Sequence, residues 1–165
     1  MNMKLKKTLF STSFLLGIIG TLLLFASIES KAQSANLRKA ISAHVSKVRV
    51  DAAEYKEARK IVYGDVDGDG KADAVVQYTL EGAGGGNSWN QHLAVFLNKK
   101  GVYKMAAEEV AGGKFSRSFD VLKIVNKEII AGTETCPEDE PQGLCENPAK
   151  KQVKYIFISG KLKEQ

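Results

Sequence analysis

The sequence predicts an α+β domain that is mostly β, with one or two N-terminal helices packed on a curved antiparallel meander sheet of about seven strands. Helical periodicity is confined to the segment before residue 60. In the segments that follow, β-branched and aromatic residues predominate, and short turns rich in glycine, asparagine and lysine separate them. The chain has 165 residues, 44% hydrophobic and 26% charged, which is ordinary for one globular domain with a core.

The first segment, residues 1–32, has the pattern of a signal peptide. Three lysines among the first seven residues precede the apolar stretch Phe14–Ala26, and small residues stand three and one positions before a cut after Ala32. We therefore expect residues 33–165 to form the mature, single domain. An uncleaved anchor is the alternative, because the apolar span from about Leu9 to Ile28 is long enough to cross a bilayer.

The charge balance argues against a nucleic-acid partner. Removal of residues 1–32 takes away four lysines and one glutamate, which lowers the formal net charge from +5 to +2. The mature chain also lacks a basic stripe interleaved with aromatic residues. No cysteine lies in the first segment, which excludes a lipid-modified N-terminus. We expect a monomer that does not associate with membranes once the signal peptide is removed.

Two helices are predicted at the start of the mature chain. The first spans Asn36–Val48, where apolar residues recur at helical spacing. His44 falls beside this apolar stripe, and we interpret it as a surface or packing residue. The second is predicted at Ala52–Arg59, with Asp51 as its N-cap and Glu54 completing a pattern similar to a capping box.

The loop of residues 65–73, with the sequence DVDGDGKAD, predicts a calcium site. Ca²⁺ takes six to eight oxygen ligands at about 2.3–2.6 Å. Carboxylates at positions one, three, five and nine, together with the carbonyl at position seven, give the candidate ligands Asp65, Asp67, Asp69, Asp73 and Lys71. Gly70 supplies the sharp turn, and carboxylates this close repel one another strongly unless a cation lies among them. An Asp- and Gly-rich turn without a metal is the alternative.

The segments that flank this loop are predicted strands, Lys60–Tyr63 before it and Asp73–Leu80 after it. Position twelve is Val76 and not the bidentate glutamate of an EF-hand. The pattern therefore resembles the strand–loop–strand calcium sites of FG-GAP and VCBS-type repeats. The loop occurs once in the chain, which argues against a full propeller.

Further strands are predicted after the glycine-rich segment at residues 82–87. They span Gln91–Leu97, Val102–Val110, Phe115–Val125, Glu128–Thr135, Val153–Ile158 and Lys161–Lys163. Cys136 and Cys145 are nine positions apart in an exported chain, which predicts a disulfide. A metal-binding pair is the weaker alternative, because no histidine or further cysteine lies nearby in the sequence. The segment between the cysteines is predicted to be a surface loop.

Residues Tyr63–Val76, the glycine-rich turn and residues His92–Asn98 together resemble a group of small exported bacterial proteins, mostly of unassigned role. Some similar proteins are periplasmic inhibitors of lysozyme-like effectors, so the resemblance implies a binding role in the periplasm or outside the cell. Beyond the calcium loop, no motif in this chain allows inhibitory residues to be carried over from those proteins.

The function predicted from these features is that of an exported calcium-binding module, and the role proposed for it is to inhibit a secreted or periplasmic enzyme. Its contact loops would be Glu81–Asn90 and Thr135–Pro148. Trp89 is either an aromatic anchor for a partner or a core residue. The acidic run Glu138–Glu140 either meets a basic partner or forms a solvated loop. A structural or adhesive role at the envelope is the alternative.

An enzyme, such as a hydrolase, is not expected. Catalysis usually requires a base, a nucleophile or a metal with an open position. The two histidines of the chain, His44 and His92, have no recognisable partner motif in the sequence. Asp120 and Glu128 straddle a predicted hairpin, and we expect both to be exposed.

Overall fold

The structure is a computed structural model that describes residues 33–82, 86–137, 140 and 145–165. The predicted signal peptide, residues 1–32, lies outside the described residues. The chain divides into two compact units after Ala35, and the architecture reported below is that of the second unit, Asn36–Gln165. In the described part of the chain, each helix is too short or too polar to cross a lipid bilayer.

The first predicted helix is confirmed and spans residues 33–48. Its apolar side chains Leu37, Ile41 and Val45 are between 0% and 3% exposed. Burial of each such side chain stabilises the fold by roughly 1.5–3 kcal/mol. The helix is therefore held on the domain mainly by its apolar stripe.

The second predicted helix is wrong. In its place the chain forms the short strand β1, Ala53–Glu54, and the one-turn 3₁₀ helix η1, Lys56–Ala58. Asp51 has a positive φ of 55°, which is not the extended backbone of an N-cap. The Glu54 carboxylate accepts two hydrogen bonds from the Arg59 guanidinium, at 2.7 and 2.6 Å, and does not cap a helix.

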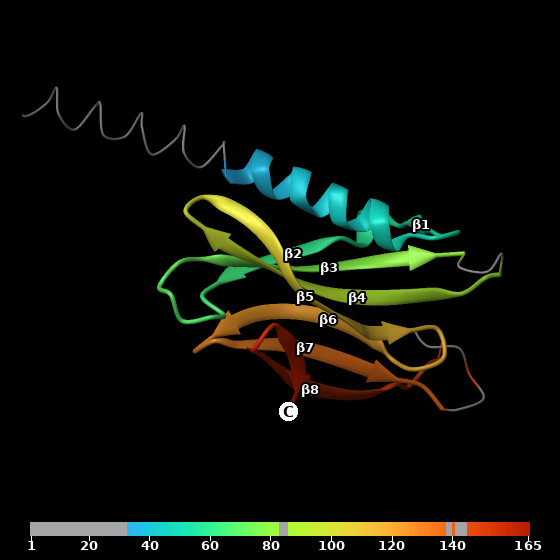
Figure 1. Cartoon of the computed structure of the whole chain (residues 1–165). Coiled ribbons are helices and arrows are strands. Elements are labelled where there is room, and N and C mark those ends of the chain that lie inside the picture. The colour runs from blue at the N-terminus through green and yellow to red at the C-terminus, as the bar shows by residue number, and fades with distance from the viewer. Residues whose placement is uncertain (1–32, 83–85, 138–139, 141–144) are drawn as a thin grey trace, which may run out of the picture. The chain divides into compact units, whose positions relative to one another are not determined.

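The strands of the described residues form two antiparallel sheets, coloured from green to red in Figure 1. Sheet A comprises β1, β2 (Lys60–Gly64), β3 (Asp73–Glu81), β4 (Trp89–Lys99) and β5 (Val102–Gly113). Sheet B comprises β6 (Ser118–Val125), β7 (Glu128–Thr135), β8 (Ala149–Ile158) and β9 (Lys161–Glu164). In sheet A, β3 pairs with β4 along one edge and with both β1 and β2 along the other. In sheet B, the strands pair in chain order.

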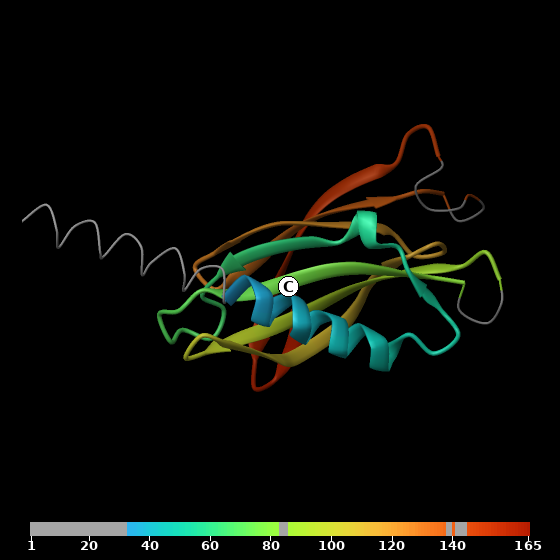
Figure 2. The same ribbon diagram turned by 90° about the horizontal axis from the view of Figure 1, so that it is seen from above.

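Sheet A is the middle of three layers, with the helix on one face and sheet B on the other (Figures 1 and 2). Alternate residues of its central strand β3 point to opposite faces. Val76 and Tyr78 pack in the core beneath the helix, whereas Val75 packs in the core between the sheets. Because both faces of β3 are covered, eight consecutive residues of this strand are buried. The prediction of a mostly β fold with a helix over a sheet is confirmed.

The predicted single meander of about seven strands is not confirmed in its details. β5 ends at Gly112 and Gly113, where a side chain would come within 2.6 and 2.7 Å of neighbouring atoms. The chain then turns at residues 114–116 and enters β6, which starts the second sheet. The backbone of β6 instead bonds to two glutamines of sheet A. The Gln77 amide bonds to Phe119 and Val121, at 2.9 and 2.7 Å, and the Gln91 amide bonds to both backbone groups of Phe119, at 2.9 and 2.7 Å.

The connections between strands gather at two ends of this unit. The loop between β2 and β3, the β4–β5 turn and the β6–β7 turn lie at the left in Figures 1 and 2. The β5–β6 turn and the described parts of the β3–β4 and β7–β8 connections lie at the opposite end. The predicted calcium loop and the described parts of the predicted contact loops therefore lie at opposite ends of this unit.

Candidate metal centre

The acidic loop lies between two strands, as predicted. It follows β2, which ends at Gly64, and it leads directly into β3, which begins at Asp73. Gly68 and Gly70 have φ angles of 84° and 79°, a backbone region that residues with a side chain rarely adopt. These two positions let the backbone turn tightly enough to aim several carboxylates at one point.

Three of the predicted ligands converge in a geometry that could hold a metal ion. Asp65, Asp67 and Asp73 each offer one carboxylate oxygen, and these oxygens lie within 4.8 Å of one another. Ligands on opposite sides of one Ca²⁺ are separated by about twice the metal–oxygen distance, or roughly 5 Å. The three oxygens are therefore close enough to share a single ion of this size.

Asp73 is the member of this group whose side chain is held in place by burial and by hydrogen bonds from the backbone. Its side chain is fully buried, and its two oxygens accept the backbone N–H groups of Val66, at 3.0 Å, and of Asn98, at 2.8 Å. The Asn98 amide also donates to the carbonyl of Ala72, at 3.1 Å, and accepts the N–H of Gly101, at 2.8 Å. Asn98 therefore ties the end of the acidic loop to the β4–β5 turn. The sequence analysis did not identify this role, because Asn98 is distant in the chain.

Asp65 organises the other end of the loop. Its two oxygens accept the backbone N–H groups of Gly68, at 2.6 Å, and Gly70, at 3.0 Å. Asp67 accepts the N–H of Asp69 at 3.1 Å. Hydrogen bonds of this kind from an aspartate to nearby backbone groups form a turn around the side chain. The loop is thus folded around its own carboxylates.

The Asp69 carboxylate is not among the three that converge. The Asp69 carboxylate accepts the backbone N–H of Lys71 at 2.9 Å, and its other oxygen lies 3.2 Å from the Lys71 ammonium. The backbone hydrogen bond from Lys71 is the main reason that the pKa of Asp69 is lowered. The roles of the Asp69 side chain and the Lys71 carbonyl as ligands remain predictions.

Two lysines from other parts of the chain, Lys99 at the end of β4 and Lys127 in the β6–β7 turn, lie against this acidic loop. The Lys99 ammonium is 2.6 Å from Asp67 and 3.2 Å from Asp69, and hydrogen bonds to these two carboxylates, first to Asp67, raise the pKa of Lys99. A side chain at Gly68 would come within 2.4 Å of the Lys127 ammonium, so this second cation also lies beside the loop. The expectation that only a metal could offset the acidic charge is therefore too strong.

A second cluster of ionisable groups, which the sequence analysis missed, lies beneath the helix. His44 Nε2 is 3.2 Å from one oxygen of Glu108, and His92 Nδ1 is 3.0 Å from the other. The Tyr78 hydroxyl donates to Glu108. Burial acts to raise the pKa of Glu108, but hydrogen bonds from His92 and Tyr78 and the charge of His44 together lower it to about 2. The helical spacing of His44 from Ile41 was the one available sequence signal.

The candidate contact end carries aromatic side chains and the disulfide. Trp89 is half-buried at the start of β4 and lines a hollow of about 210 Å³ together with Phe115, which is 80% exposed. Trp89 is therefore neither a fully buried core residue nor a fully exposed one. Cys136 and Cys145 form the predicted disulfide. Of the acidic run, Glu140 is described, whereas Glu138 and Asp139 lie outside the described residues.

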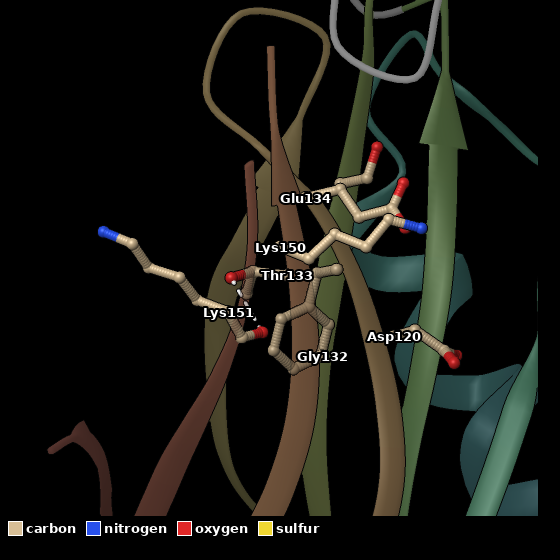
Figure 3. Close-up of a pocket in the computed structure, with 8 residues that line it drawn as sticks. Asp120, Gly132, Thr133, Glu134, Lys150 and Lys151 are labelled. Carbon is tan, nitrogen blue, oxygen red and sulfur yellow. Dashed lines mark hydrogen bonds and ion pairs between the residues drawn. The ribbon is translucent and has the colours of Figure 1, made fainter. Parts of the chain in front are cut away.

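A larger hollow, of about 380 Å³, lies across β6, β7 and β8 (Figure 3). It opens above Gly132, where a side chain would meet no atom within 4 Å. The two acidic residues at its rim, Asp120 and Glu134, are paired with lysines. Glu134 lies 3.0 Å from Lys150, and Asp120 lies 2.8 Å from Lys60, at exposed positions. Such surface pairs are typical of solvated strands, so this hollow is a weaker candidate for a binding site than the acidic loop.

No protein family matches this sequence, and neither a curated protein nor a solved structure matches it.

Proposed function

We propose that this chain is an exported calcium-binding domain that acts as a binding module in the periplasm or outside the cell. The observation that supports calcium binding is the convergence of Asp65, Asp67 and Asp73 within 4.8 Å at a turn between two strands. The donors are all carboxylate oxygens, which suit hard cations such as Ca²⁺, Mg²⁺ or Mn²⁺ better than softer transition metals. The predicted leader and the disulfide both agree with export.

Ca²⁺ is the proposed ion because the loop offers many flexible oxygen ligands. Mg²⁺ demands near-ideal octahedral geometry and retains several waters, whereas Ca²⁺ accepts six to eight ligands in irregular arrangements. The proposed ligands are the carboxylates of Asp65, Asp67, Asp69 and Asp73, with the carbonyl of Lys71. Asp69 and Asp67 would exchange their contacts with the Lys99 ammonium for contacts with the ion.

Calcium titration of the mature domain, residues 33–165, tests this site. Thermal unfolding should shift to higher temperature as Ca²⁺ is added, because the ion binds only the folded loop. We expect a dissociation constant of about 10⁻⁴–10⁻³ M, as is common for extracellular modules. Asp67→Ala should abolish most of this shift, whereas the matched control Asp120→Ala, at an exposed aspartate outside the loop, should retain it. An unchanged unfolding temperature in verified metal-free protein would contradict the assignment.

The proposed partner-binding surface is the end of the molecule opposite the acidic loop. Phe115 is 80% exposed and stands beside the half-buried Trp89. Aromatic residues often dominate binding energy at interfaces, and these two lie side by side at the rim of one hollow. The acidic residues Glu140 and Glu146 line a hollow of about 470 Å³ at the disulfide loop. We propose that this end binds a basic secreted or periplasmic enzyme as an inhibitor.

Capture from a periplasmic or culture extract tests the partner role. Wild-type protein should retain a specific protein, and Phe115→Ala should lose it because its exposed ring is removed. Phe115→Ala should melt at the same temperature as the wild type, since this side chain is not part of either core. Equal capture by both proteins would place the contact surface elsewhere, and no captured protein in the presence of calcium would count against a binding module.

A further inference from the structure

The first half of β8 is an outer strand in the described part of the chain. On one edge β8 pairs with β7 over Ala149–Ile156, whereas on the other edge β9 covers only Tyr155–Ile158. Just beyond this pairing, the Gln165 N–H donates to the carbonyl of Lys154, at 2.9 Å. Among the described strands, none pairs with the second edge of residues 149–153. This half of β8 therefore has a neighbouring strand on one side only.

The direction of the backbone groups along this open edge follows from the pairing. In an antiparallel ladder, the N–H and C=O of one residue point to the same side, and successive residues point to opposite sides. Lys154 directs its carbonyl to the side of β9, and the pairing of β8 with β7 has no register shift. Gln152 and Lys150, two and four positions earlier, therefore direct their backbone groups to that same side. Each offers one donor and one acceptor to an added strand.

Other outer strands of this unit have such groups closed by side chains. At the start of β5 the Tyr103 N–H donates to the Asn36 side chain, at 3.1 Å, and near its end the Ala111 carbonyl accepts from Arg117, at 2.7 Å. The bridging glutamines of sheet A bond to β6 in the same way. Among the described residues, no side chain bonds to the outward backbone groups of β8 at residues 150 and 152, and both residues are exposed. This edge is left open where others are closed.

The charges along this edge indicate the chemistry of a partner. The segment Ala149–Lys154 holds three lysines and no acidic residue. Lys150 and Lys151 point in opposite directions, so each face of the sheet carries one of them (Figure 3). Lys150 lies 3.0 Å from Glu134, but its side chain is 72% exposed, and a pair this exposed holds the lysine only weakly. An incoming strand would therefore meet a positive charge on both of its faces.

A second copy of this chain is a poor occupant of the edge. Antiparallel pairing of two β8 edges about Lys151 would place this lysine opposite its own copy, and pairing about Lys150 would do the same for that residue. Like charges directly opposite one another on neighbouring strands are destabilising, whereas opposite charges stabilise the pairing. The edge therefore disfavours self-association and favours a strand that carries acidic side chains.

We propose that the open edge of β8, at Lys150–Gln152, binds an extended acidic segment of another protein by strand addition. In this mode of recognition, backbone hydrogen bonds supply affinity and side chains supply specificity. Two consecutive acidic residues in the segment would face Lys150 and Lys151, one on each face of the sheet. The surface and the charge of this partner differ from those of the enzyme partner in the proposed function. The inference therefore goes beyond that function and does not depend on it.

Titration of the mature domain with a synthetic peptide, acetyl-Thr-Val-Thr-Glu-Glu-Val-Thr-amide, tests the proposal. NMR spectra of the backbone amides report where the peptide binds. At millimolar peptide, the amide signals of Lys150 and Gln152 should shift and exchange more slowly with solvent, because their N–H groups gain acceptors. A control peptide with two lysines in place of the two glutamates should bind roughly ten-fold more weakly, since it places like charges opposite one another.

Gln152→Pro separates strand addition from simple attraction between charges. Proline removes an outward N–H but keeps every lysine, and outer strands tolerate it where the N–H faces solvent. This variant should bind the acidic peptide at least about ten-fold more weakly than the wild type. The matched control Gln152→Thr keeps the N–H and should bind as the wild type does. If Gln152→Pro does not fold, a peptide methylated on the backbone nitrogens that face β8 makes the same test with wild-type protein, and it should not bind.

Three results would overturn the proposal. Equal binding by Gln152→Pro and the wild type, or by the methylated and unmethylated peptides, would show attraction between charges without strand addition. Amide shifts centred away from Lys150 and Gln152, or no shift at millimolar peptide, would show that this edge does not receive the segment. Sedimentation of the free domain addresses self-association, and a dimer that Gln152→Pro dissociates would assign the edge to a second copy instead.

Discussion

The acidic loop at the surface and the Glu108 cluster beneath the helix both place carboxylates beside cationic or titratable groups. In the loop, four aspartates lie within nine residues, and the ammonium of Lys99 contacts two of them. Beneath the helix, one carboxylate takes up contacts from two histidines and a tyrosine. The loop carboxylates are offset by flexible lysines from outside the loop, whereas the partly buried Glu108 contacts side chains fixed by the helix and sheet A. The comparison indicates that four clustered carboxylates leave room for an added cation, while the single carboxylate beneath the helix is matched group by group.

Asp73→Ala is predicted to give the largest effect on the free energy of unfolding, because Asp73 lies in the loop but is fully buried, whereas Glu108 is partly buried. Asp73→Ala leaves the backbone N–H groups of Val66 and Asn98 without their acceptor. Each buried donor left unpaired costs about 1–3 kcal/mol, so we expect a loss of roughly 2–6 kcal/mol in the free energy of unfolding. Urea unfolding of the metal-free domain measures this loss.

Asp67→Ala is the matched control in the same loop. The Asp67 side chain is 17% exposed and bonds mainly to the Lys99 ammonium, which is itself at the surface. We therefore expect a change of less than about 1 kcal/mol without metal. If both substitutions destabilised the metal-free domain equally, the division between a structural and a metal-binding aspartate would be wrong.

Substitution of Glu108 is predicted to give the next largest effect on the free energy of unfolding, and this effect depends on pH. Its pKa is lowered to about 2 from the ordinary 4.5, so its stabilising contribution is complete above that ordinary value and is lost as the pH falls toward 2. Wild-type stability should therefore drop between about pH 5 and pH 2 by more than that of Glu108→Gln. Urea unfolding across this range gives both curves.

The other carboxylates titrate in both proteins, including Glu164, whose pKa Arg117 also lowers to about 2. Their contribution therefore cancels when the two curves are subtracted. Parallel curves for wild type and Glu108→Gln would mean that the buried carboxylate is not held ionised by its partners.

Substitution of Lys99 is predicted to give the smallest effect, and this effect is on the affinity for the proposed ion and not on the stability of the fold. Its ammonium lies 2.6 Å from Asp67, and under the proposed function it would compete with Ca²⁺ for that carboxylate. Lys99→Gln should therefore tighten calcium binding by a few-fold, since an exposed charge pair contributes about 1 kcal/mol or less. Calorimetric titration measures the affinity. Lys163→Gln removes a lysine from β9 and should leave the affinity unchanged apart from a small long-range effect.

Local patterns predicted the parts of the fold that depend on near neighbours in the sequence. The apolar spacing of Leu37, Ile41 and Val45 predicted the helix, and the flanking β-branched residues predicted the strands around the acidic loop. The two cysteines predicted the disulfide. Three of the five predicted metal ligands converge, because Asp65, Asp67 and Asp73 lie in one turn.

Contacts between distant residues could not be predicted in this way. Glu54 was assigned to a helix because its partner, Arg59, was not considered, and one sheet was expected because nothing local marks β6 as the start of another. The cluster around Glu108 joins four elements, and the contact of Lys99 with the acidic loop spans about thirty residues. These features follow from how the layers stack, which single-strand periodicity does not specify.

The glutamines that bridge the two sheets have a consequence for behaviour in solution. An outer strand with open backbone groups can recruit a strand from another molecule and begin a fibril. The side-chain amides of Gln77 and Gln91 occupy backbone groups of Phe119 and Val121 on β6, which is a terminal strand of its sheet. These amides take the place of a neighbouring strand, so this segment of β6 has fewer open backbone groups with which to recruit a strand from another molecule.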